Sequence, residues 1–257
     1  MMHRILACCL LFFLYGCNML DPAARARELN KTALKYSRKE DRQEAIKYFY
    51  QASQVEGITD SQRTLILENM GNEYRHYKTD SAKYYYYQAA CVNNRNSYNW
   101  LFSMANCYLM DKRTDSALPL LIRAGERDSM GMQNNNILGC VYMGEYGEGY
   151  TDLVKALKYN LRYDRVAQSA TSAFTLAKNY YLLNDTTRSV QLFEEIYQKY
   201  PNYTPALGSL IMVYKELGRS ADAETMLDDL KKKDYARYKR VVAVNIKAGE
   251  HGLTWHY

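Results

Sequence analysis

A tyrosine recurs along most of the chain at nearly constant spacing. Six tyrosines follow one another at intervals of 38, 34, 34, 38 and 34 residues: Tyr36, Tyr74, Tyr108, Tyr142, Tyr180 and Tyr214. Tyrosine supplies 26 of the 257 residues, so six aligned tyrosines would arise by chance only about once in a million. The recurrence indicates an internal repeat, which is typical of a solenoid whose units pack on their neighbours.

Four further columns recur with each tyrosine, one at a fixed distance before it and three after it at internal spacings of four and then three residues. Three residues before it the residue is small in five of six repeats: Ala33, Gly71, Ala105, Gly139, Ala177 and Ile211. A mostly small column, a large apolar column and a small or apolar column follow: Ala45, Ala82, Ala117, Gly149, Ser189, Ala223; Phe49, Tyr86, Leu121, Leu153, Phe193, Leu227; Ala52, Ala89, Ala124, Ala156, Ile196, Leu230. Offsets of three, four and seven place residues on one helix face, so each unit is predicted to be two antiparallel helices.

This order of small, aromatic, small, large apolar and small residues in a unit of 34 residues resembles the tetratricopeptide repeat. The resemblance covers residues 26–237 as six units. It implies an all-α, right-handed superhelical solenoid of about six helix-turn-helix repeats. The chain departs from the family at the position of its signature tryptophan, which holds other residues here: Leu29, Leu67, Leu101, Asn135, Ala173 and Leu207.

The first 17 residues have the pattern of an export signal. A short basic start ends at Arg4, residues 5–15 are apolar and uncharged, and residues 18–27 are polar. A positive start, a short apolar core and small residues at its end are typical of a secretory signal. The apolar run is too short to span a bilayer, which needs about 20 residues.

The end of this run, Leu14-Tyr15-Gly16-Cys17, resembles the lipobox of bacterial lipoproteins, although Tyr15 replaces the usual small residue. The resemblance implies a signal peptide over residues 1–16, a lipid on the sulfur of Cys17 and a tether over residues 17–25. It further implies a place in the cell envelope of a Gram-negative bacterium, at the outer membrane. The alternative is a plain N-terminal anchor or cleaved signal with incidental cysteines.

The remaining cysteines and the histidines form no known chemical motif. Cys91, Cys107 and Cys140 are odd in number and contain no CxxC pair, so neither a disulfide framework nor a zinc site is predicted. We expect all three cysteines to be small buried residues on helices. A disulfide between Cys107 and Cys140 in an oxidising compartment is the open alternative. No signature of a hydrolase or metalloprotease occurs. We therefore expect no enzyme activity, cofactor or metal; a cryptic active site is the alternative.

The C-terminal region is predicted to close the stack. Residues 234–248 continue as a helix with an apolar stripe, and residues 238–257 are assigned to a capping helix and tail. Basic residues occupy its polar side and the segment before it: Lys231, Lys232, Lys233, Arg237, Lys239, Arg240 and Lys247. A solvated cap is the preferred interpretation, and a basic docking patch is the alternative. The mild net charge of +6 does not require a nucleic-acid partner.

The resemblance also implies where a partner binds, because the first helix of each unit lines the concave face in this family. The positions carried over form an amide-rich groove with aromatic islands: Asn99, Phe102, Asn106, Leu109, Gln133, Asn136, Cys140, Met143, Thr171, Phe174, Lys178 and Tyr181. Amide side chains both donate and accept, which suits an extended peptide backbone. Phe102, Phe174 and Tyr181 are expected to act as anchors. The alternative is a hydrated groove with partners on the convex side or the edges.

Four short Asp-Ser or Asp-Thr segments form a second surface feature. They resemble O-glycosylation sites of exported proteins in one bacterial phylum, which would place sugars on Ser81, Ser116, Ser129 and Thr186. Three of them stand where the second helix of a unit is predicted to begin. Because Asp, Ser and Thr are frequent N-caps, helix capping is the preferred interpretation.

Two classes of function follow. The first is a membrane-tethered interaction scaffold or assembly adaptor, whose partner is another protein bound as a peptide or helix. The second is a sensory subunit of an envelope signalling system, since similar exported arrays precede a transmembrane helix and a regulator. No second apolar span follows the repeats in residues 238–257, which favours the scaffold.

Overall fold

The computed structural model describes residues 21–39, 41–75 and 77–243, and in this part every regular element is a helix. The chain divides into two compact units, residues 1–128 and 129–257. The predicted signal, Cys17 and the end of the C-terminal helix lie outside the described residues.

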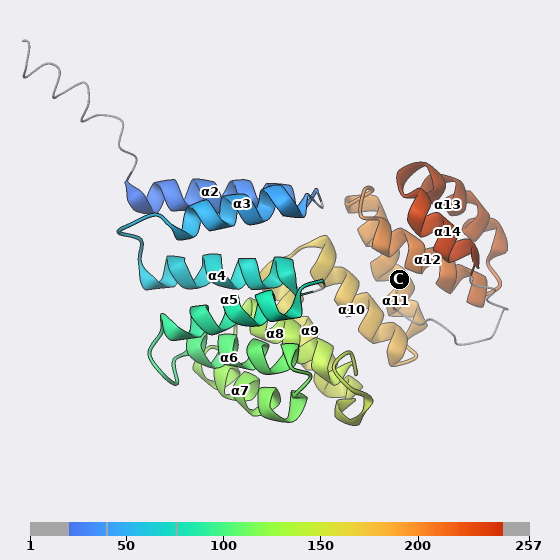
Figure 1. Ribbon diagram of the computed structural model, residues 1–257. Coiled ribbons are helices and arrows are strands. Elements are labelled where there is room, and N and C mark those ends of the chain that lie inside the picture. The colour runs from blue at the N-terminus through green and yellow to red at the C-terminus, as the bar shows by residue number, and fades with distance from the viewer. Residues whose placement is uncertain (1–20, 40, 76, 244–257) are drawn as a thin grey trace, which may run out of the picture. The chain divides into compact units, whose positions relative to one another are not determined.

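The described part of unit 1 forms three consecutive helix pairs (Figure 1). Its helices are α2 (Pro22–Ser37), α3 (Arg42–Ser53), α4 (Asp60–Tyr74), α5 (Thr79–Cys91), α6 (Tyr98–Met110) and α7 (Thr114–Arg127). The predicted columns are buried, as in the first pair, where Ala33, Ala45, Phe49 and Ala52 are all inaccessible to solvent. The helix α2 begins four residues before the predicted start of the repeats.

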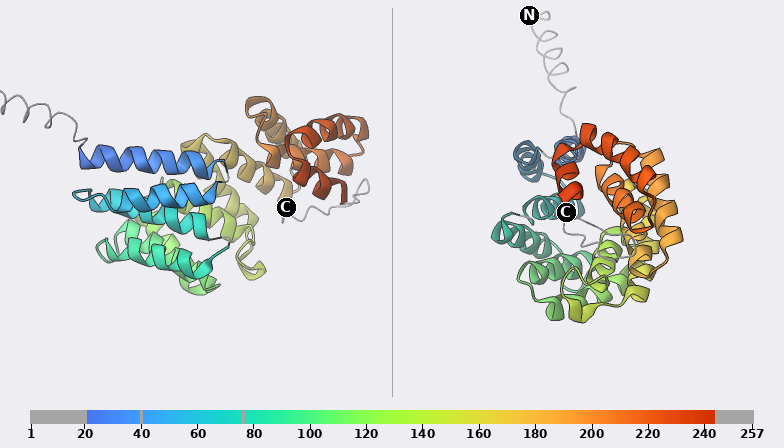
Figure 2. Two further views of the ribbon diagram at one scale, coloured as in Figure 1. Left: turned by 45° about the horizontal axis from the view of Figure 1, so that its top comes forward. Right: turned by 90° about the vertical axis from the view of Figure 1, so that its right-hand side faces the viewer.

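In unit 2, residues 129–243 form three more pairs and one further helix (Figures 1 and 2). Its elements are α8 (Met132–Tyr142), the 3-10 turn η1 (Glu148–Tyr150), α9 (Leu153–Ala167), α10 (Ala170–Leu182), α11 (Thr186–Lys199), α12 (Thr204–Glu216), α13 (Ser220–Lys233) and α14 (Tyr235–Ala243). The prediction of consecutive helix pairs is confirmed. One alignment is wrong: Gly149 lies exposed in η1 rather than in the packed small column.

The final helix α14 packs on α12 and α13, as expected of a cap. Gly208 of α12 allows this approach, because a Cβ there would lie 3.2 Å from Arg237 and 3.5 Å from Val241. Val241 is buried, but Tyr235 and Val242 are 58% and 48% exposed. The predicted apolar stripe is therefore only partly covered.

The recurring tyrosine closes the turn within every pair. Its carbonyl accepts a hydrogen bond from the backbone N–H of the residue that caps the second helix, over 2.8–3.1 Å. The six donors are Asp41, Lys78, Arg113, Asp152, Asp185 and Arg219. A carbonyl in the last turn of a helix has no partner within its own helix, so this bond satisfies it and fixes where the next helix starts.

The tyrosine rings pack against side chains of the same helix pair. Three stack on a second tyrosine with centroids 5.4–5.7 Å apart: Tyr36 on Tyr48, Tyr74 on Tyr85 and Tyr142 on Tyr159. Three carry a guanidinium group 3.9–5.4 Å from the ring centroid: Tyr108 with Arg113, Tyr180 with Arg188 and Tyr214 with Arg219. Both arrangements are attractive, and the ring can use either because it is aromatic and electron-rich.

Small residues three positions before the tyrosine allow close helix contact. A Cβ on Gly71 would meet the ring of Tyr86 at 2.7 Å, and one on Gly139 would meet Asn160 Oδ1 at 1.9 Å. Asn160 is fully buried, and its Nδ2 donates to Asn179 Oδ1 over 3.0 Å. The side chain of Asn160 is therefore held in place and cannot easily move aside.

We predict that Gly139→Ala lowers the free energy of unfolding by about 1–3 kcal/mol, since the new methyl group overlaps the Asn160 side chain. Chemical denaturation followed by circular dichroism measures the change. Gly149→Ala is the matched control, because a Cβ at Gly149 meets no atom within 4 Å. An equal effect of both substitutions would contradict the close contact.

Candidate functional site

The first helices of the pairs carry the predicted binding face, and in unit 1 side-chain hydrogen bonds join them. Asn69 Nδ2 of α4 donates to Asn30 Oδ1 of α2 over 3.1 Å. Ser103 Oγ of α6 donates to Glu68 Oε1 of α4 over 2.7 Å. Asn30 and Glu68 each stand six residues before a repeat tyrosine, and their donors stand five before the next one. The same pair of repeat positions thus links α2 to α4 and α4 to α6.

Glu68 is an acidic group inside this face. Only 6% of the residue is exposed, and Ser103 is 0% exposed. Burial raises the pKa of Glu68 from 4.5 to about 7, because the charged form loses its hydration, while the hydrogen bond from Ser103 opposes part of the rise. The carboxyl group therefore changes its protonation state near neutral pH.

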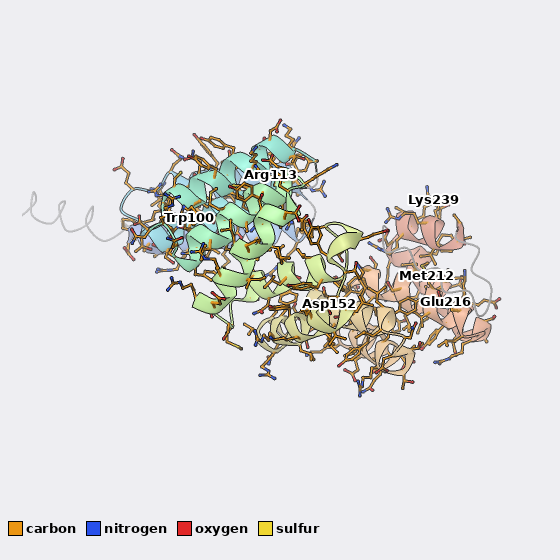
Figure 3. All side chains as sticks on the ribbon, turned by 90° about the horizontal axis from the view of Figure 1, so that it is seen from below. Trp100, Arg113, Asp152, Met212, Glu216 and Lys239 are labelled. Carbon is orange, nitrogen blue, oxygen red and sulfur yellow. The ribbon has the colours of Figure 1, made fainter. Side chains whose placement is uncertain are left out.

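Polar contacts also join successive pairs in unit 2. Lys178 Nζ of α10 lies 2.5 Å from Glu145 Oε1, in the loop between α8 and η1. Tyr181 OH of α10 donates to the carboxylate of Glu216 on α12, over 2.8 and 2.7 Å to its two oxygens. Figure 3 marks Glu216 and Met212 on α12. Lys178 and Tyr181, which the sequence analysis assigned to the binding groove, therefore contact other residues of unit 2.

The predicted groove residues differ in accessibility. Phe102, Asn106 and Tyr181 are 4%, 1% and 7% exposed, so the structure does not support open anchors at these positions. Asn106 Nδ2 donates to Phe102 O of its own helix over 3.0 Å, and the Phe102 ring stacks on Tyr98. Their burial places them in the helix stack.

Leu109 and Met143 of the predicted groove are also buried. The other seven groove residues keep part of their surface accessible: Asn99, Gln133, Asn136, Cys140, Thr171, Phe174 and Lys178. Asn99 belongs to unit 1 and the other six to unit 2. The Phe174 ring is held by Phe193 and Tyr203, with both centroids 5.8 Å away. Asn99 Nδ2 donates to Asn93 Oδ1 over 3.2 Å. Their role in binding stays a prediction.

The four predicted modification sites lie near helix ends. Asp185 caps α11 as expected, accepting from Arg188 N over 3.1 Å. Asp80 and Asp115 do not cap; each is the second residue of its helix, after Lys78 and Arg113 at the N-cap positions. There they stabilise the positive helix N-terminus by charge. Ser129 is exposed, and Ser81, Ser116 and Thr186 are half-buried.

Sequence reasoning missed two surface depressions in unit 1. One, of about 390 Å³, lies between α5 and α6 and includes Tyr84, Tyr87 and the buried Cys107. Burial raises the pKa of the Cys107 thiol to about 12, so it stays protonated. All three described cysteines are free, so the alternative Cys107–Cys140 bridge is absent. The run of four tyrosines at residues 84–87 was the sequence feature that could have indicated this depression.

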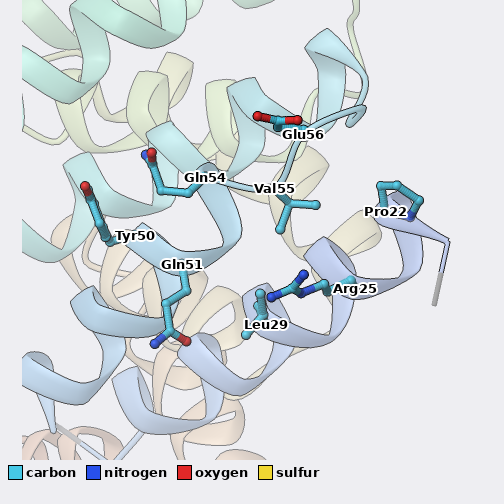
Figure 4. A pocket seen from close by; sticks show the side chains of 8 residues that line it. All are labelled: Pro22, Arg25, Leu29, Tyr50, Gln51, Gln54, Val55 and Glu56. Carbon is cyan, nitrogen blue, oxygen red and sulfur yellow. The ribbon is translucent and has the colours of Figure 1, made fainter. Parts of the chain in front are cut away.

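The other depression, of about 790 Å³, is formed by α2 and α3 and the segment after α3 (Figure 4). Pro22, Arg25 and Leu29 line it from α2, and Tyr50 and Gln54 from the opposite side. No signal in the repeat pattern marks it, because it lies at the end of the repeats rather than between two of them.

Within residues 21–243, apart from the two single-residue gaps, no helix is both long and apolar enough to cross a membrane. In the same part of the chain, no three His, Cys, Asp or Glu side chains are grouped so that they could hold a metal ion.

These features define an α-helical repeat protein built from stacked helix pairs. Residues 180–244 match the family model described as "Tetratricopeptide repeat". Residues 180–244 are therefore similar to the tetratricopeptide repeat, and the same kind of helix pair recurs through the described chain.

Two solved structures share the fold. A Pseudomonas aeruginosa pilF structure has a TM-score of 0.53 at 14% identity, over 85% of this chain and 97% of that chain. A tetratricopeptide repeat protein from Parabacteroides merdae ATCC 43184 has a TM-score of 0.51 at 15% identity, over 85% and 86%. At these identities the likeness shows the fold alone. No curated protein matches the sequence.

Glu68 gives a pH-dependent prediction. Its pKa is higher in the folded chain, so its contribution to stability is present below about pH 4.5 and is lost as the pH rises through about 7. The free energy of unfolding lost over this pH range is of the order of 3 kcal/mol. We expect Glu68→Gln to stabilise the protein more at pH 8 than at pH 5, measured by urea denaturation.

The exposed Glu126 on α7 supplies the control. Glu126→Gln should shift stability by similar small amounts at the two pH values. If Glu68→Gln behaved in the same way, the burial of a titrating carboxyl group at Glu68 would be contradicted.

Proposed function

We propose that the protein is a lipid-tethered scaffold of the bacterial envelope, which holds a partner protein close to the membrane. The observation that carries the proposal is the placement of Gly16-Cys17 between an apolar run and the repeats. Only residues 18–21 lie between Cys17 and α2, the first described helix, which begins at Pro22. An acyl chain on Cys17 would hold the repeat stack directly at the membrane surface.

The fold supports a role in protein binding. Tetratricopeptide-repeat proteins are typically non-enzymatic interaction scaffolds, and their stacked helices offer extended faces to a partner. In unit 2 such a face includes the accessible amides Gln133 and Asn136 and the partly exposed Phe174 ring. A peptide or helix lying there would exchange hydrogen bonds with the amides and cover the ring.

Lipid attachment is tested at Cys17. Cys17→Ala should remove the acyl mass from the mature protein and release it from the membrane fraction or leave it unprocessed. Fractionation combined with intact-mass measurement reads both outcomes. Cys91→Ala is the matched control, because Cys91 lies exposed at the end of α5, far along the chain from the signal. Normal processing and membrane retention of Cys17→Ala would disprove the tether.

The binding face is tested by removing its amides. Gln133→Ala with Asn136→Ala should weaken capture of the physiological partner about 30-fold, since each of the two lost hydrogen bonds contributes about 1 kcal/mol. Lys239→Glu with Arg240→Glu on α14 should have much less effect. Quantitative pull-down from membranes of the native host measures both. The reverse ranking would place the partner on the basic end of unit 2 instead.

A further inference from the structure

The helix α2 of unit 1 has a stripe of positive charge. Arg27, Lys31, Lys35 and Arg38 follow one another at intervals of four, four and three residues, so they lie along one side of α2 and its C-cap. We call these four residues the α2 stripe. All four are exposed, whereas Ala26 and Ala33 of the same helix are buried. The positive side therefore points away from the packed core of unit 1.

Within residues 21–39, 41–75 and 77–243, no carboxylate oxygen lies within 4.0 Å of a charged nitrogen of the α2 stripe. Other helices of the protein do form such pairs one turn apart, for example Lys47 with Glu44 and Lys155 with Asp152. Over residues 22–39 the sequence has six basic residues and one acidic residue, Glu28.

The C-terminal region has the same composition but a different arrangement. Residues 231–243 also hold six basic residues and one acidic residue. There, Lys233 pairs with Asp229 at 2.6 Å and Arg237 with Asp234 at 3.2 Å. Lys231 and Lys239 lie over tyrosine rings, 5.5 and 5.2 Å from the centroids. Much of the positive charge in this region already has a partner within the chain.

We propose that the α2 stripe lies on the anionic lipid headgroups of the membrane that holds the chain; this rests on the proposed lipid tether. Five residue steps connect Cys17 to Pro22 and extend to at most about 18 Å. The helix itself is about 24 Å long, and charges are screened beyond about 8 Å at physiological salt. Four exposed cations can all reach headgroup phosphates only if α2 lies along the surface.

The tether and the stripe would act together. A single acyl chain gives only reversible membrane binding, and a polybasic surface is one of the second signals that make it stable. Each Lys or Arg close to an anionic surface strengthens binding about fivefold. Arg25 lies on a different side of α2 from the stripe, where it lines the depression between α2 and α3 (Figure 4), and is not counted among the four cations.

The test uses the whole chain with Cys17→Ser, which cannot be acylated at that position. Co-sedimentation compares vesicles of phosphatidylcholine alone with vesicles that also contain phosphatidylglycerol. The preference for the anionic vesicles should fall about 25-fold with Lys31→Gln and Lys35→Gln, at fivefold per cation. It should also disappear in about 1 M salt, where the screening length is about 3 Å.

The matched control is Lys232→Gln with Lys239→Gln, which removes the same charge from the C-terminal region and should leave most of the preference intact. Residues 1–20 differ in none of these proteins, so their contribution cancels. Equal binding to both kinds of vesicle, or equal losses in the two double variants, would overturn the proposal. So would tighter binding of soluble polyglutamate, which would indicate an acidic protein partner. Failure of Cys17 acylation would appear in the intact mass and would leave this measurement unchanged.

Discussion

The hydrogen bond from the second helix to the tyrosine carbonyl is the contact on which the repeated architecture depends. It joins the last turn of one helix to the capping residue of the next, so it sets both ends of the turn at once. In three turns the residue before the donor takes a left-handed conformation: Lys112, Asn184 and Gly218, with φ of 57°, 62° and 72°. The tyrosine ring then packs over the turn on an aromatic or cationic side chain, which holds the two helices together.

The helix pairs could be predicted from the sequence because their determinants recur. Tyrosine at a spacing of 34 or 38 residues and small residues at offsets of three, four and seven define two helices and their contact face. Gly149 was the position where this reasoning failed, because the turn between α8 and α9 contains extra residues. A fixed spacing therefore predicts a helix face well only where the loop length is also constant.

The binding face was less predictable, because accessibility depends on residues from neighbouring pairs. Within its own repeat, Tyr181 has the position of an aromatic anchor. Its hydroxyl group, however, donates a hydrogen bond to Glu216, which lies 35 residues later in the chain. Likewise Glu68 and Ser103 are ordinary polar residues until α4 and α6 pack together and bury both. The prediction that Asp80 and Asp115 cap their helices failed for a simpler reason. Each is the second residue of its helix rather than the N-cap residue. A pattern of residue types does not locate a helix end to within one or two residues.

The turn bond is made entirely by backbone atoms, and this has a consequence for how the protein can change over evolutionary time. Substitutions can alter the donor residue freely, as its identity here shows: Asp in three turns, Arg in two and Lys in one. Side chains that would mark a repeat can thus diverge while the helix pair keeps its geometry. This accounts for a family match confined to residues 180–244 in a chain whose fold is shared with structures only 14–15% identical to it. In a fold held by such bonds, the arrangement of the helices can stay alike after the sequences have ceased to be similar.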